Sequence, residues 1–331
     1  MGNALISRFG TASTGDEVER IILTSDALKV SILTWGAAIQ DVRLAGVDRP
    51  LTLGSDRLAD YEGQMRHHGT IIGPVVNRIS TGRVTIDGMT YELERNFRGR
   101  IHLHSGKLAI HRRNWKILSA TETEAVLALE LEDGECGLPG RRRITARYTV
   151  DGPCLALQIE GETDAPTLMS IANHSYWNLD GSQDYGGHRL WIDADRYLPS
   201  TEDFYPTGEI AEVADTVMDF RRTREIAPGA PQFDNCFCLS DAPSGLRPVL
   251  RLTGARGVEM TVATNQPGIH VYDGREAIRP GRGPFEGLAI EAEFWPDAPT
   301  NPHFPSIRLD PEHRYRQETT WTFWDGQTER A

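Results

Sequence analysis

The sequence predicts an all-β protein, a large antiparallel β-sandwich with residues 1–331 in a single domain. Three observations support this fold class. Apolar and polar side chains alternate with a period of two along much of the chain, which is the pattern of strands that bury one face. The 32 glycines and 19 prolines lie mostly between the alternating runs, where turns join short strands. A helical period of 3.6 residues is nearly absent, with residues 56–61 as the best short helical candidate.

Individual strands can be predicted in chain order. Residues 125–131 alternate, and every second residue from 144 to 150 is apolar. The Asp-Gly-Pro sequence at 151–153 supplies turn chemistry before the next alternating run, 155–160, so these two runs are expected to form a hairpin. Residues 258–262 repeat the pattern. Because antiparallel sheets with one apolar face must bury that face, we expect two or more sheets packed against each other.

The composition is that of an ordinary globular protein, with 39% hydrophobic and 25% charged residues, which excludes a disordered or fibrous chain. No linker, charge block or internal repeat divides the sequence, which favours one domain. The 47 acidic and 35 basic residues give a net charge of −12. Nucleic acid is therefore not expected as a partner, and a neutral or cationic small ligand fits this charge better.

Targeting and cofactor patterns are scarce. The first ten residues lack the basic and apolar regions of a secretory signal, and no apolar run approaches the length of a membrane helix. The four cysteines form no CxxC pair, so reduced thiols and a cytoplasmic protein without a membrane partner are expected. GxGxxG, Walker A and HExxH patterns are absent, which disfavours nucleotide-binding and zinc-protease functions. The sequence does not indicate the oligomeric state.

Two histidines stand two residues apart in a probable strand. His102 and His104 would share one face there, and His111 follows downstream, so a metal site is conceivable. No carboxylate or histidine stands at the ligand spacing in between, and no metal is therefore predicted. Two interpretations remain open: histidines satisfied by backbone hydrogen bonds, or histidines that donate hydrogen bonds to a polar ligand.

A pair of acids follows the apolar run 288–290. If residues 288–293 form a strand, Glu291 and Glu293 emerge on one face, which could be a solvated sheet surface. Alternatively, one carboxyl group is partly desolvated beside Phe294 and Trp295, and its raised pKa makes it a general base near neutral pH. These aromatic neighbours would also offer apolar faces to a sugar ring.

The segment 170–181 combines a histidine with amides and aromatic residues. His174 can donate and accept a proton near neutral pH, because the ordinary pKa of histidine is about 6.5. Tyr176 and Trp177, interleaved with asparagines, suit a sugar-binding wall, although a polar strand end before the Asp-Gly turn at 180–181 would look similar.

Several segments in the same order along most of the chain resemble the aldose 1-epimerase (galactose mutarotase) family. They are SILTWGAAIQDV at 31–42, GPVVNRIS at 73–80, LHSG at 103–106, DGECGLPG at 133–140, NHSYWNLDG at 173–181, RYLPSTEDFYPTGEI at 196–210, FDNCFCL at 233–239 and IEAEFWPDAPTNPHFP at 290–305. Each segment is weakly specific alone, and their common order makes the resemblance specific. It implies a β-sandwich of the galactose mutarotase-like supersandwich type.

The resemblance also implies a reaction, the interconversion of α and β anomers of a free aldose without a cofactor. Glu291 matches the family's general base for the anomeric hydroxyl, and His174 matches the general acid for the ring oxygen. The expected substrate-binding residues are the matched Arg78, His104 and Asp234, together with Asn77 and Trp177 from the matching segments. The expected partner is a monosaccharide substrate.

Four positions depart from the family pattern. The family often has Arg at Pro74, Gly at Ser105, His at Asn235 and Gln at Glu293, so the sequence leaves the identity of the aldose open.

Two alternative functions remain. A mutarotase for phosphorylated sugars would need a basic cluster, which Arg100, Arg112 and Arg113 could supply. A sugar-binding protein of the same fold would not need both an acid and a base. A glycoside hydrolase is disfavoured because it needs two carboxyl groups at the scissile bond.

Overall fold

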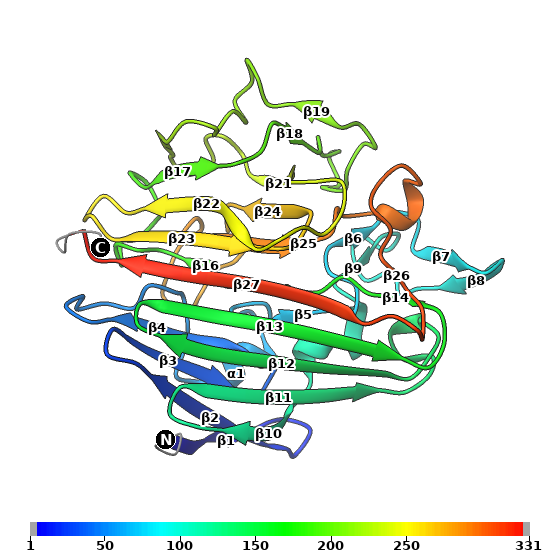
Figure 1. Ribbon diagram of the computed structural model, residues 1–331, viewed down its shortest axis with the longest axis horizontal. Coiled ribbons are helices and arrows are strands. Elements are labelled where there is room, and N and C mark those ends of the chain that lie inside the picture. Colours follow the sequence, from blue (N-terminus) through cyan, green and yellow to red (C-terminus); the bar gives the residue numbers. More distant parts are fainter. Residues whose placement is uncertain (1–4, 327–331) are drawn as a thin grey trace.

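The computed structural model describes residues 5–326, which form antiparallel β-sheets with only short helical segments (Figure 1). The expected all-β fold is confirmed. The largest sheet has nine strands in the order β10 (Lys116–Ala120), β11 (Glu124–Leu131), β12 (Arg142–Asp151), β13 (Cys154–Thr163), β27 (Tyr315–Trp324), β23 (Glu259–Thr264), β22 (Arg247–Thr253), β17 (Arg189–Ile192) and β20 (Arg224–Glu225).

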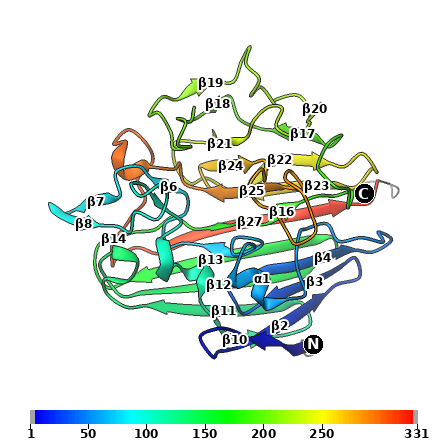
Figure 2. The same cartoon turned by 180° about the vertical axis from the view of Figure 1, so that it is seen from behind.

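Two further sheets lie behind this one in Figure 1 and in front of it in Figure 2. The six-stranded sheet has the order β16 (Tyr176–Trp177), β25 (Leu288–Glu293), β24 (Gly268–Tyr272), β21 (Asp234–Cys238), β18 (Arg196–Tyr197) and β19 (Ala211–Glu212). The four-stranded sheet has the order β1 (Leu5–Thr11), β2 (Glu17–Thr24), β3 (Leu28–Leu33) and β4 (Ile39–Leu44).

Short strand pairs join segments that lie far apart in the sequence. They are β5 (Ile71–Ile72) with β15 (Ala172–Asn173), β6 (Arg78–Ile79) with β9 (His102–Leu103), β14 (Thr167–Leu168) with β26 (Arg308–Leu309), and β7 (Arg83–Ile86) with β8 (Met89–Glu92). The 3₁₀ segments are η1 (Gly106–Leu108), η2 (Ile110–Arg112), η3 (Glu135–Gly137) and η4 (Ala298–Thr300).

The predicted hairpin and short helix are both present. Strands β12 and β13 pair in register from Arg142 opposite Thr163 to Asp151 opposite Cys154. The expected helix at 56–61 is α1 (Leu58–Glu62), which buries its apolar side chains against the four-stranded sheet. None of the helices in the described range 5–326 is long and apolar enough to cross a membrane.

The main core lies between the sheets, as the alternating pattern requires. Most inward side chains of β11, β12 and β13 are fully buried there, together with apolar residues of β3, β4, β24 and β25. The buried hydroxyl of Tyr148 on β12 donates a 2.6 Å hydrogen bond to the carbonyl oxygen of Ala37, just before β4. This polar contact joins the nine-stranded and four-stranded sheets inside an otherwise apolar interface.

Candidate active site

A cavity of about 200 Å³ opens beside the six-stranded sheet. Strands β16, β21, β24 and β25, which face the viewer in Figure 2, supply much of its lining. The cavity brings together most of the site residues expected from the sequence, which are Asn77, Arg78, His104, His174, Asp234 and Glu291.

Glu291 and His174 meet in this cavity. Glu291 lies on the central strand β25, and its Oε1 atom is 3.4 Å from Nε2 of His174. Both side chains are almost completely buried. His174 follows β15, and its backbone is held by hydrogen bonds to Thr70 and Gly69 at 2.9 and 3.0 Å. The pairing of β15 with β5 therefore positions the imidazole against a carboxyl group that lies far away in the sequence.

The two groups have opposite pKa shifts. Burial raises the pKa of Glu291, and the negative charge of Glu293 raises it further. Burial lowers the pKa of His174 to about 3. Both shifts favour the uncharged form of each group, so burial favours a pair with one proton, held by the carboxyl group.

Glu293 lies two residues further along β25 and does not line the cavity. It is fully buried and accepts a 3.1 Å hydrogen bond from the side-chain amide of Asn77. Burial raises the pKa of Glu293 as well. The expectation that Glu291 and Glu293 occupy one face is met, and that face is buried rather than solvated.

A chain of polar side chains in the cavity lining includes His270, which no sequence prediction singled out. Nε2 of His270 lies 2.9 Å from Oδ1 of Asp234, and Nδ1 lies 3.6 Å from Oε1 of Glu293. His270 stands directly opposite Glu291 in the pairing of β24 with β25. Only this non-local strand pairing places it there, and no motif in the sequence marks it.

Arg78 and Asp234 form a bidentate ion pair in the cavity. The two guanidinium nitrogens each lie 3.2 Å from a carboxylate oxygen. Burial alone would raise the pKa of Asp234, but Arg78 and the hydrogen-bonded His270 outweigh burial and lower this pKa. The carboxylate therefore stays ionised and holds the guanidinium in place.

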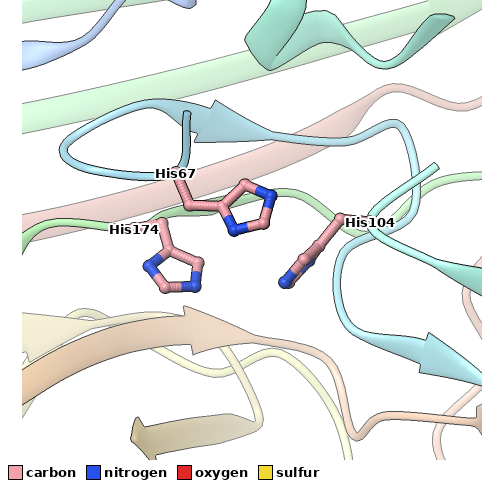
Figure 3. Close-up of side chains that lie close together, drawn as sticks. All are labelled: His67, His104 and His174. Atoms are coloured by element: carbon pink, nitrogen blue, oxygen red, sulfur yellow. The ribbon is translucent and has the colours of Figure 1, made fainter. Parts of the chain in front are cut away.

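Three imidazoles gather at one side of the cavity (Figure 3). The side-chain nitrogens of His67, His104 and His174 lie within 4.8 Å of one another. The sequence analysis missed His67, which precedes β5. Burial and the neighbouring histidines lower the pKa of His67 and of His104, so both are neutral near pH 7.

The position of the proton on the His104 ring determines which kind of ligand this cluster can bind. Its Nδ1 atom accepts a 3.1 Å hydrogen bond from the backbone N–H of Asn77, so the proton of the neutral ring is on Nε2. His104 in this form donates a hydrogen bond through Nε2 and has no free lone pair there for a metal ion. The cluster is therefore better suited to a hydroxyl-rich ligand than to a metal.

His102 and His104 do not share a face, contrary to the strand expectation. Strand β9 ends at Leu103, and His104 has a left-handed backbone with φ of 52°. This turn directs His104 to the cavity, whereas His102 contacts the carbonyl oxygen of Glu94 through Nδ1 at 2.7 Å. His111 packs against His67, with ring centroids 5.1 Å apart.

Trp177 is not part of the cavity lining, which corrects its expected role in substrate binding. Neighbouring residues of a strand point to opposite faces, so Tyr176 of β16 lines the cavity and Trp177 points into the core. There the indole packs 6.0 Å from the ring of Trp321.

The aromatic residues beside Glu291 in the sequence also lie outside the cavity. Trp295 packs on Phe304, and Phe294 packs against the core. The aromatic wall of the cavity consists instead of Phe97, Tyr176, Phe204 and Tyr272.

Comparison with known proteins identifies the family. The family model described as aldose 1-epimerase matches residues 19–322. The chain belongs to the aldose 1-epimerase family. A galactose mutarotase of Bos taurus is 33% identical over 327 residues, which cover 92% of this chain and 93% of the relative. An aldose 1-epimerase of Escherichia coli K12 is 30% identical over 336 residues, with 94% and 97% covered.

Solved structures of similar proteins share the fold of this aldose 1-epimerase family member. An aldose epimerase homologue from C. elegans has a TM-score of 0.84 at 28% identity and covers 92% of this chain and 98% of its own. A galactose 1-epimerase from Lactobacillus acidophilus NCFM has a TM-score of 0.86 at 24% identity and covers 99% and 100%.

These similarities confirm the family, the fold and the class of enzyme expected from the sequence, a carbohydrate isomerase that interconverts aldose anomers. They do not favour the alternatives, a mutarotase for phosphorylated sugars or a non-catalytic binding protein.

Proposed function

We propose that Glu291 is the general base and His174 the general acid of an enzyme that interconverts the α and β anomers of a free aldose by ring opening. The observation that carries this assignment is the 3.4 Å approach of a buried carboxyl group and a buried imidazole inside a cavity lined by hydrogen-bonding groups. Oε2 of Glu291 and Nδ1 of His174 have no hydrogen-bond partner among the described residues.

The reaction requires one proton to move in each direction. The Glu291 carboxylate removes the proton of the anomeric hydroxyl, and the electrons of that O–H bond form the carbonyl at C1. The bond between C1 and the ring oxygen breaks, and the ring oxygen takes the proton of His174. Rotation about the C1–C2 bond followed by closure with reversed roles gives the other anomer.

The pair has zero net charge before and after this transfer. Carboxylate with imidazolium becomes carboxylic acid with imidazole, and burial favours the second of these states. Sugar hydroxyls that contact the pair can stabilise the ionised state, helped by the positive charge of Arg78, which lowers the pKa of Glu291.

The other cavity residues bind and orient the sugar in this proposal. Nε2–H of His104 donates to a sugar oxygen, and the guanidinium of Arg78 does the same while Asp234 holds it. Nε of Arg78 is buried without a hydrogen-bond partner in the described part of the chain, so it remains for the substrate. Asn77 also lines the cavity, but its side-chain amide donates to Glu293, so it supports the site through that carboxyl group.

Polarimetry on freshly dissolved α-anomers of several aldoses tests the assignment. We expect Glu291→Gln and His174→Asn each to lower turnover by about 10² to 10⁴-fold, the usual contribution of general acid or base catalysis. Glu312→Gln and His313→Asn, on exposed residues, serve as matched controls and should turn over like wild type. Wild-type turnover by either active-site variant would remove that residue from the mechanism.

The cytoplasmic location and the single-domain organisation expected from the sequence stay predictions.

A further inference from the structure

A second cavity adjoins the active site. It has a volume of about 450 Å³ and shares Arg66, His67, Phe97, Leu103 and His104 with the first cavity. The imidazoles of His67 and His104 therefore lie at the boundary between the two spaces. A substrate bound against His174 could extend past these rings into the second cavity.

Arg66, which lines both cavities, and Arg112 of the second cavity differ from other arginines of this region. Arg78 is paired with Asp234, Arg275 with Asp273, and both Arg98 and Arg100 with Asp203. In contrast, Arg66 and Arg112 are exposed and have no carboxylate within 4.0 Å among residues 5–326.

The remaining charges of the second cavity largely cancel. Lys107 lies 3.5 Å from Glu94, and its backbone N–H also donates to that carboxylate at 2.8 Å. The histidines His67, His104 and His111 have lowered pKa values, mainly because of burial, and carry no charge near pH 7. The second cavity therefore has two uncompensated positive charges in a protein whose net charge is −12.

Arg66 and Arg112 both influence the same histidine, His111. Besides burial, both guanidinium groups lower the pKa of His111, which is about 3. The ring of His111 packs 5.1 Å from the ring of His67. Both arginines line the second cavity together with this histidine pair, and Arg66 also lines the active-site cavity.

The orientation of the sugar follows from the proposed acid. His174 protonates the ring oxygen, and C5, which bears C6, is bonded to that oxygen. The C6 substituent therefore lies near His174, whose ring centroid is 5.5 Å from that of His104 and 5.6 Å from that of His67. C1, the other neighbour of the ring oxygen, is held at Glu291 through its hydroxyl, so the C6 substituent is the end of the sugar that extends toward the second cavity.

We propose that the substrate is an aldose with a carboxylate at C6, a hexuronate, and that Arg66 and Arg112 bind this carboxylate. The inference rests on the proposed function, because it uses His174 as the acid at the ring oxygen. Guanidinium groups pair with carboxylates through charge-assisted hydrogen bonds. A phosphate dianion fits less well, because two of the three arginines that the sequence offered for a phosphate clamp are already paired, Arg100 with Asp203 and Arg113 with Glu135.

Exchange of the anomeric protons at equilibrium, measured by NMR, tests the proposal with galacturonate and glucuronate against galactose, glucose and their 6-phosphates. We expect kcat/KM for a uronate to exceed that for its parent hexose by at least about tenfold. In Arg66→Gln combined with Arg112→Gln this ratio should fall to near one, mainly through a higher KM for the uronate. Added salt should raise the uronate KM of wild type and have little effect on that of the variant.

Arg57→Gln is the matched control, because Arg57 is exposed, lies outside both cavities, and has no ion-pair partner in the described range. Its uronate preference should equal that of wild type. A wild-type preference for neutral hexoses or for 6-phosphates would overturn the proposal while leaving the mutarotase mechanism intact. An unchanged ratio in the double variant would also overturn it. Absence of catalysed exchange with every sugar would overturn both proposals together.

Discussion

At the scale of single residues, the site depends on one proton shared by a carboxyl group and an imidazole. Burial raises the pKa of Glu291 and lowers that of His174, so it favours the uncharged form of both groups. The pair is active while it holds one proton. Turnover should therefore fall at low pH, where a second proton binds, and at high pH, where the shared proton is lost.

The neighbouring carboxyl group of Glu293 tunes this pH range. Once ionised, Glu293 favours proton binding by the pair, so Glu293→Gln removes a cause of the raised pKa of Glu291. Because burial delays the ionisation of Glu293 to higher pH, we expect the high-pH limb of the kcat/KM profile to move to lower pH, as measured by polarimetry across a buffer series. A profile that coincides with that of wild type would show that Glu293 has no electrostatic role.

The sequence predicts the chemical roles of the site residues better than it predicts which residues surround them. Glu291 and His174 could be singled out because carboxylate and imidazole chemistry is visible in their local segments. The burial of Glu293 and the approach of His270 depend on the pairing of β24 with β25, which no local pattern reports. Trp177 was misplaced because a single strand does not reveal which of its faces lies toward the cavity.

At the scale of elements, short connections between distant segments build the cavity. The hydroxyl of Ser105 accepts a 2.8 Å hydrogen bond from the backbone N–H of Val75 and donates one of 2.9 Å to its carbonyl oxygen. Ser105 is buried and has a left-handed backbone with φ of 60°. This one side chain thus joins the loop before β6, the strand of Arg78, to the loop that contains His104.

Ser105→Ala should lower the free energy of unfolding by about 1–3 kcal/mol, because it leaves a buried N–H without a partner. Ser105→Gly loses the same bonds but relieves the left-handed backbone, so its stability should lie between those of wild type and Ser105→Ala. Urea unfolding measures the free energy of unfolding of wild type and the two Ser105 variants, with exposed Ser244→Ala as control. A glycine variant less stable than the alanine variant would contradict this reasoning.

At the scale of the whole molecule, the protein buries several neutral histidines. Burial lowers the pKa of His68, His111 and His174 to about 3, and it lowers those of His67 and His104 as well. Above pH 6.5 these groups are neutral in both the folded and the unfolded protein. Below pH 6.5 the unfolded chain binds protons that the folded protein excludes, so stability is lost as the pH falls from about 6.5 toward about 3.

For each histidine, the free energy of unfolding falls by at most about 1.4 kcal/mol per pH unit as the pH decreases. The raised pKa values of Glu291 and Glu293 act in the opposite direction, but the lowered histidines outnumber them. Urea unfolding between pH 7.5 and 4.5 should show this loss, and His68→Asn should reduce the slope whereas exposed His313→Asn should not lower it comparably. Equal stability at both ends of the range would refute the prediction.

The sequence predicts some of the sheet architecture, as it predicts some of the site chemistry. The β12–β13 hairpin follows from local alternation and its turn. The order of nine strands in one sheet, with β27 inserted between β13 and β23, depends on side chains that meet only after folding. A one-dimensional pattern therefore predicts that such sheets exist but not how their strands are ordered.

The join between β5 and β15 links residues about a hundred positions apart, and the join between β24 and β25 brackets a long loop. Contacts of such high sequence separation are slow to form, because the intervening chain must first be ordered. The base Glu291 and the acid His174 depend on different strand pairings, and neither group can work without the other. During refolding, the return of turnover will therefore mark the completion of the slowest long-range pairings rather than the first appearance of β-structure.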